Sequence, residues 1–156
     1  MGIDRGSGFT LIELIIVMAI SVIIIISSYS IIGFNFKSQS ELELTAREII
    51  SVLRNAQDRS ISQEDSSQWG VYFENAANNS GFYVLYRGVT TTFVSKKNLR
   101  PNIQFLDPVI GNSKNISFNK MNGLPTSSTT VVIFLKNNSL ATTTITINSN
   151  GQIQYK

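Results

Sequence analysis

The sequence predicts an α+β fold in which one long N-terminal helix is followed by a small antiparallel β-sandwich. Three observations lead to this prediction. Residues 9–36 are almost continuously apolar, residues 37–64 repeat apolar side chains every three or four positions, and residues 65–156 contain short β-rich runs separated by polar turns. A chain of 156 residues has room for one globular domain beside a membrane-spanning helix.

The apolar run begins at Phe9 and is long enough for a transmembrane helix, which needs about 20 mostly apolar residues. Ser21 is the one polar residue between Leu14 and Ile26. Glu13 lies at the head of the run, with no Lys or Arg within one helical turn. A carboxylate deep in a bilayer costs about 2.5–3.5 kcal/mol even on the insertion scale, so Glu13 is a candidate functional residue.

Cleavage between Gly8 and Phe9 would give Glu13 a partner. The new α-amino group of Phe9 would lie one helical turn from the carboxylate, in the same chain or in a neighbouring copy packed alongside. The run from Gly8 to Glu13 reads Gly-Phe-Thr-Leu-Ile-Glu and stands directly before the apolar segment. In these residues the chain resembles the precursors of type IV pilins and the pseudopilins of type II secretion.

The resemblance implies processing and assembly roles for three residues. A prepilin peptidase in the membrane would cut after Gly8, removing residues 1–8 as a leader, and would methylate the new N-terminus at Phe9. Glu13 would pair with the N-terminus of an adjacent subunit in a helical filament of a type IV pilus or a type II secretion system. The helix 9–36 would hold the precursor in the cytoplasmic membrane, with its N-terminus in the cytoplasm and its head in the periplasm or at the cell surface.

Two other interpretations fit the same segment. An ordinary secretory signal would be cut near residues 28–30, although Asp4 offsets the charge of Arg5 in the leader. In a plain single-pass anchor, Glu13 would only favour the helix N-terminus through the macrodipole. The helix 9–36 also has no proline, unlike many major pilins.

Residues 37–64 predict the amphipathic half of the same helix. Apolar residues recur at helical spacing, and charged residues occupy the other faces. No proline interrupts the pattern, so we expect one continuous helix from Phe9 to about Ser62, about 80 Å long. The residues expected to face the core are Leu42, Ala46, Ile49, Ile50, Leu53, Ala56 and Ile61.

The β-rich head is expected to span residues 65–156. Its expected strands are 69–73, 81–86, 91–94, 103–106, 116–118, 130–135, 141–148 and 152–155. We expect 130–135 to be buried on both faces, and Asn150-Gly151 predicts a type I′ hairpin turn. The order of these runs resembles the H-type minor pseudopilins and related minor pilins, which implies two antiparallel sheets packed against the helix.

The composition argues against an enzyme. The chain has no His and no Cys, so the commonest general base is missing and catalysis would need paired carboxylates or a Ser–Lys arrangement. The sequence contains no catalytic constellation, no metal-binding motif and no cofactor motif. The expected function is therefore structural, with prepilin peptidase, other pilin or pseudopilin subunits and the membrane as partners.

A basic loop, residues 96–101, supplies an alternative function. Lys96, Lys97 and Arg100 lie in it and could contact the phosphates of DNA, with a strong dependence on salt. The net charge of +3 permits such binding without demanding it. The alternative is therefore a DNA-binding minor pilin in natural DNA uptake, and a solvated basic loop is the simpler interpretation of the same residues.

Overall fold

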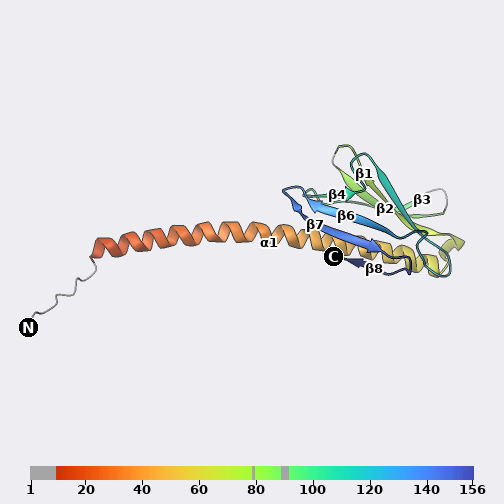
Figure 1. The fold of residues 1–156 in the computed structure, drawn as a ribbon, viewed down its shortest axis with the longest axis horizontal. Helices are drawn as coiled ribbons and strands as arrows, with labels where there is room; N and C mark the ends of the chain where they lie inside the picture. The colour runs from red at the N-terminus through yellow and green to blue at the C-terminus, as the bar shows by residue number, and fades with distance from the viewer. Residues whose placement is uncertain (1–9, 79, 89–91) are drawn as a thin grey trace, which may run out of the picture. The chain divides into compact units, whose positions relative to one another are not determined.

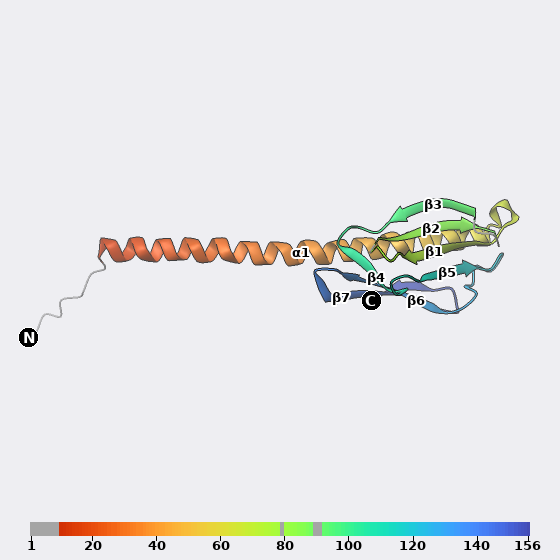
Figure 2. The same ribbon diagram turned by 90° about the horizontal axis from the view of Figure 1, so that it is seen from above.

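A computed structural model gives the arrangement of the chain (Figure 1, Figure 2). It describes residues 10–78, 80–88 and 92–156, without the side chains of residues 28–38. Two compact units are present, Met1–Lys37 and Ser38–Lys156. The elements in order are helix α1 (Leu11–Ile61), a 3-10 turn η1 (Glu64–Ser66), and the strands β1 (Trp69–Asn75), β2 (Gly81–Arg87), β3 (Thr92–Asn98), β4 (Ile103–Asp107), β5 (Ser113–Phe118), β6 (Thr129–Leu135), β7 (Asn138–Ile147) and β8 (Ile153–Tyr155). The predicted fold class, a long N-terminal helix followed by antiparallel sheets, is confirmed.

The first unit is helical from Leu11. Thr10 caps the helix, because its Oγ1 accepts a hydrogen bond from the Glu13 N–H at 3.4 Å and its carbonyl accepts one from the Leu14 N–H at 3.2 Å. All side chains from Leu11 to Ser27 are exposed. Within the part of the chain that the structure describes, no helix combines the length and the hydropathy that crossing a membrane requires. Phe9 and the side chains of residues 28–36, which belong to the expected span, lie outside the described residues.

In the second unit, α1 buries the predicted apolar stripe. Six of the seven expected core residues are at most 6% exposed, which confirms them: Leu42, Ala46, Ile49, Ile50, Leu53 and Ala56. The prediction is wrong for Ile61, which is 45% exposed. Ile61 ends the helix, where it lies against the backbone of Gly123 and not beneath a sheet.

Two antiparallel four-stranded sheets complete the head, with strand orders β3-β2-β1-β5 and β4-β6-β7-β8. Both lie beside the C-terminal part of α1 (Figure 1, Figure 2). One apolar core joins the three layers, drawing Leu53 from the helix, Phe73 from the first sheet and Ile133 from the second. Each of these side chains is fully buried, so the sheets supply the cover that the amphipathic helix needs.

Several details of the head differ from the sequence-based expectations. The basic loop begins later than expected, because β3 continues through Lys96 and Lys97 to Asn98. Thr91, the expected start of this strand, lies outside the described residues. Strand β6 alternates between buried and half-buried residues instead of being buried on both faces, since only one of its faces meets the core.

The Asn150-Gly151 turn is also not type I′. Gly151 has φ +83°, whereas Asn150 is not among the residues with positive φ, and type I′ requires both. The Gly151 N–H donates to the Asn148 carbonyl at 2.9 Å, and the Asn148 N–H donates to the Gln152 carbonyl at 3.0 Å. This pattern matches a three-residue loop in which glycine follows an ordinary turn.

Candidate functional site

The helix start holds the residue expected to drive assembly. Glu13 occupies the third helical position, and Thr10 satisfies its backbone N–H. In a full capping box, the Glu13 carboxylate would also accept a hydrogen bond from the Thr10 N–H. Within residues 10–78, 80–88 and 92–156, the carboxylate makes neither that bond nor an ion pair, and the side chain is exposed. Gly8 and Phe9, the expected processing residues, lie outside the described residues.

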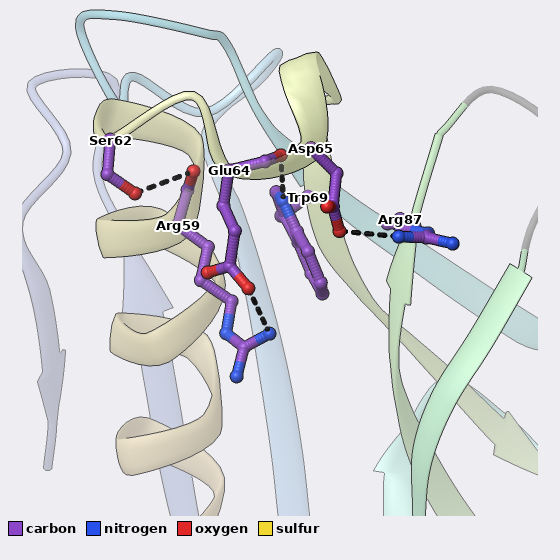
Figure 3. A network of polar contacts seen from close by, with 6 residues as sticks. All are labelled: Arg59, Ser62, Glu64, Asp65, Trp69 and Arg87. Atoms are coloured by element: carbon purple, nitrogen blue, oxygen red, sulfur yellow. Dashed lines mark hydrogen bonds and ion pairs between the residues drawn. The ribbon is translucent and has the colours of Figure 1, made fainter.

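Polar side chains fix the other end of α1 to the head (Figure 3). The Arg59 guanidinium lies 3.0 Å from the Glu64 carboxylate and 4.6 Å from the centre of the Trp69 ring. The Trp69 indole N–H donates to the Glu64 carbonyl at 3.0 Å. Because the Trp69 side chain is buried in the core, these contacts tie the chain leaving the helix to the first strand.

The turn after the helix has an uncommon backbone. Gln63, Asp65 and Ser66 all have positive φ, between 50° and 55°, which non-glycine residues seldom adopt. An ion pair from Arg87 on β2 holds the Asp65 carboxylate (Figure 3). Lys120 donates to the Ser66 carbonyl at 2.8 Å. Glu64 and Asp65 are thus engaged within the chain, and their contacts point to a structural role for this turn.

The cations proposed to bind DNA do not share one surface. Lys96 and Lys97 are consecutive in β3, so their side chains point to opposite faces of the sheet. Lys97 lies opposite Tyr83 and lines a cavity of about 290 Å³ against α1. Lys96 sits 3.7 Å above the centre of the Phe82 ring, on the other face. Arg100 is 2.8 Å from the Glu48 carboxylate of α1.

Lys136 completes the surroundings of Lys96 and Arg100. It lies in the turn between β6 and β7, and it lines the same cavity as these two residues. The local sequence did not predict that Lys136 lies near Arg100, because 36 positions separate the two residues and no motif marks Lys136. Only the packing of the two sheets brings the three cations together.

The surroundings shift the pKa values of Tyr83, Tyr86 and Glu43. Burial raises the pKa of Tyr83 to about 12, and the Glu48 carboxylate adds to this shift. Burial also raises the pKa of Tyr86, against hydrogen bonds from Asn115 and Ser117. On the helix surface, hydrogen bonding to Arg47 lowers the pKa of Glu43.

Comparisons with known proteins agree with these features. Residues 4–29 match the family described as the prokaryotic N-terminal methylation motif, a segment that includes Gly8, Phe9 and Glu13. A comparison with curated protein sequences found no significant match.

Solved structures share the fold. The crystal structure of the type IV minor pilin FimU from Pseudomonas aeruginosa is similar with a TM-score of 0.55 and 17% identity, covering 78% of this chain and 92% of that one. The minor pseudopilin EpsH from the type 2 secretion system of Vibrio cholerae is similar with a TM-score of 0.53 and 13% identity, covering 74% of this chain and 94% of that one. The chain therefore carries the prokaryotic N-terminal methylation motif on an α+β fold similar to that of a type IV minor pilin and a minor pseudopilin.

Proposed function

We propose that the chain is a minor pilin or pseudopilin, a subunit of a type IV pilus or a type II secretion filament. Prepilin peptidase cuts the precursor between Gly8 and Phe9 and methylates Phe9. The helix 9–36 anchors the subunit in the cytoplasmic membrane before assembly, with the head on the outer side. The observation that carries the proposal is the N-terminal methylation motif over residues 4–29, which includes the start of α1 and Glu13 in its first turn.

The state of Glu13 supports the pairing role. Thr10 already caps the helix through its own hydroxyl and carbonyl, so capping does not use the Glu13 carboxylate. A free α-amino group on Phe9 of an adjacent subunit supplies the missing positive charge. In the apolar surroundings of packed helices, such a pair is far stronger than an ion pair in water.

The surface of the helix supports burial against other molecules. From Leu11 to Ser27 the side chains are apolar except for Glu13, Ser21 and Ser27. Both serine hydroxyls donate within the helix, Ser21 to the Val17 carbonyl at 2.8 Å and Ser27 to the Ile23 carbonyl at 2.9 Å. A helix that is apolar all round beyond Glu13 and satisfies its serine hydroxyls internally is suited to lipid and to a helical bundle.

The test replaces Glu13 by glutamine, which keeps the size of the side chain and removes its charge. Glu13→Gln is expected to be cleaved and methylated normally, as mass spectrometry of the membrane-extracted protein would show. Its incorporation into sheared or purified filaments is expected to fall at least about tenfold, the effect of losing a buried charge pair.

Asp58→Asn is the matched control, since it removes one exposed carboxylate from the same helix far from the N-terminus. Normal incorporation of Glu13→Gln would refute the pairing role. Retention of residues 1–8 in cells with active prepilin peptidase would refute the proposed function itself.

The alternative proposal, a DNA-binding minor pilin, needs Lys96, Lys97 and Arg100 to act together. The two lysines point to opposite faces of β3, and Glu48 pairs with Arg100. A continuous phosphate-binding strip is therefore poorly supported, and the structural role is the better proposal.

A further inference from the structure

A cavity of about 420 Å³ opens beside β3, between the β1–β2 hairpin and the β6–β7 turn. Its charged lining residues among those the structure describes are Lys96, Arg100 and Lys136. Glu48 of α1 lies 2.8 Å from Arg100 and offsets part of this charge. Three cations that line one cavity form a local field that attracts anions.

Two of the cations are held in place by other side chains: Lys96 by the Phe82 ring and Arg100 by the Glu48 carboxylate. The Lys96 ammonium rests on the face of the Phe82 ring, 3.7 Å from its centre, and this neutral partner does not compensate its charge. Glu48 fixes the Arg100 guanidinium at 2.8 Å, and Arg100 still has further N–H donors available. Both side chains are therefore oriented before any ligand arrives, which lowers the entropic cost of binding.

The remaining lining residues select among anions. Ser80 and Asn98 add a hydroxyl and an amide to the nitrogen donors. Phe82, Leu99 and Pro101 add apolar surface to the lining. A phosphate group matches the many donors and the planar guanidinium, and an organic body attached to it would pack against this apolar surface.

We propose that this cavity binds a phosphomonoester, a phosphate group carried on a small sugar- or ring-containing body. The assignment does not depend on the filament role, because none of the lining residues belongs to the N-terminal segment. It also differs from a basic strip along β3, because it includes Lys136 and excludes Lys97.

The experiment measures binding to the full-length processed chain in a non-ionic detergent by isothermal titration calorimetry. The probes are thymidine monophosphate, inorganic phosphate and thymidine. The nucleotide is expected to bind saturably and more tightly than inorganic phosphate, and thymidine is expected not to bind. An unphosphorylated oligothymidylate carries only phosphodiesters, so it is expected not to bind; binding that depends on Lys96 and Lys136 would overturn the assignment to a phosphomonoester.

Three matched variants each remove one positive charge and keep an unbranched apolar side chain. Lys96→Met and Lys136→Met are expected to weaken nucleotide binding about fivefold to tenfold. Lys97→Met, one residue away on the other face of β3, is expected to leave it unchanged. Circular dichroism verifies that each variant is folded.

Equal losses in Lys97→Met and Lys96→Met would overturn the proposal in favour of general attraction along the strand. Absence of nucleotide binding at millimolar concentration would also overturn it. Filament incorporation of Lys96→Met is expected to match the wild type, so failure of the cavity and failure of the filament role give different results.

Discussion

The apolar side chains at the two ends of helix α1 lie in opposite environments. From Leu11 to Ile26 the large apolar side chains are between 51% and 78% exposed. In the part that belongs to the head, the apolar stripe from Leu42 to Ala56 is at most 6% exposed. The chain provides sheets to cover the second stretch, whereas among the described residues nothing covers the first. Apolar surface of this extent stays exposed only when another molecule is meant to bury it.

The polar contacts of the two stretches of α1 also differ. In the head, charged residues of α1 bond to other elements, as Arg59 does to Glu64 and Glu48 does to Arg100. In the first stretch, the serine hydroxyls bond only within the helix, and the Glu13 carboxylate has no ion-pair partner among the described residues. The polar contacts of the head thus join separate elements, whereas those of the N-terminal stretch stay within one helix.

The largest expected effect on stability comes from removing an aromatic ring from the core of the head. Phe73 is fully buried and lies 5.8 Å from Phe105 of the second sheet, centre to centre, and 6.2 Å from Tyr83. Phe73→Ala is expected to lower the free energy of unfolding by about 3–5 kcal/mol, measured by urea denaturation of the processed chain. Phe93→Ala is the control, because that ring is 56% exposed and its loss should change stability little.

Cleavage after Gly8 should continue in Phe73→Ala, because the N-terminal methylation motif ends at residue 29 and includes no residue of the head. Loss of cleavage in this variant, with normal membrane insertion, would contradict the separation between the two regions.

A smaller effect is expected where the helix fastens two turns of the head. The Gln57 amide donates to the Gly123 carbonyl and to the Gly151 carbonyl, each at 2.9 Å. Gln57→Ala should lower the free energy of unfolding by about 1–3 kcal/mol, since two carbonyls lose their donor. Asn55→Ala, on the exposed face of the same helix, should be nearly neutral. Equal stability of the two variants would mean that water replaces the Gln57 amide at no cost.

Local patterns were enough to predict the helix and its buried stripe. Each core residue from Leu42 to Ala56 follows from a spacing of three or four, which depends on no distant part of the chain. The motif from Gly8 to Glu13 could also be recognised in the sequence, because it consists of six consecutive residues.

Features that depend on distant residues or on turn geometry could not be predicted in the same way. The sequence predicts that strand β3 ends at residue 94, because Lys96 and Lys97 are typical of a basic loop. The structure continues β3 through both lysines, which an edge strand accommodates well. Lys136 joins Lys96 only through the packing of the sheets. Asn-Gly fits two kinds of hairpin, and the hydrogen bonds around Gly151 decide between them.

The smallest expected effect at neutral pH comes from Tyr83, and it becomes visible only in alkali. Burial raises its pKa to about 12 in the folded head, compared with about 10 for an unfolded chain. The folded state therefore holds the phenolic proton more tightly, so its contribution to stability is complete below about pH 10 and is lost as the pH rises towards 12. The stretch from Leu11 to Ser27 contains no tyrosine, so this loss belongs to the head alone.

Tyr83→Phe removes the ionisable group and keeps the ring in the core. The variant is expected to stay within about 1 kcal/mol of the wild type at pH 7, and to lose less stability than the wild type between pH 10 and 12. Urea denaturation across this range measures the difference, and tyrosinate absorbance should show one late-titrating group fewer. Tyr155→Phe, at an exposed ring, should retain the wild-type loss. If Tyr83→Phe weakens in alkali as steeply as the wild type, another group must control the alkaline unfolding of the head, and the raised pKa of Tyr86 makes its hydroxyl the next one to remove.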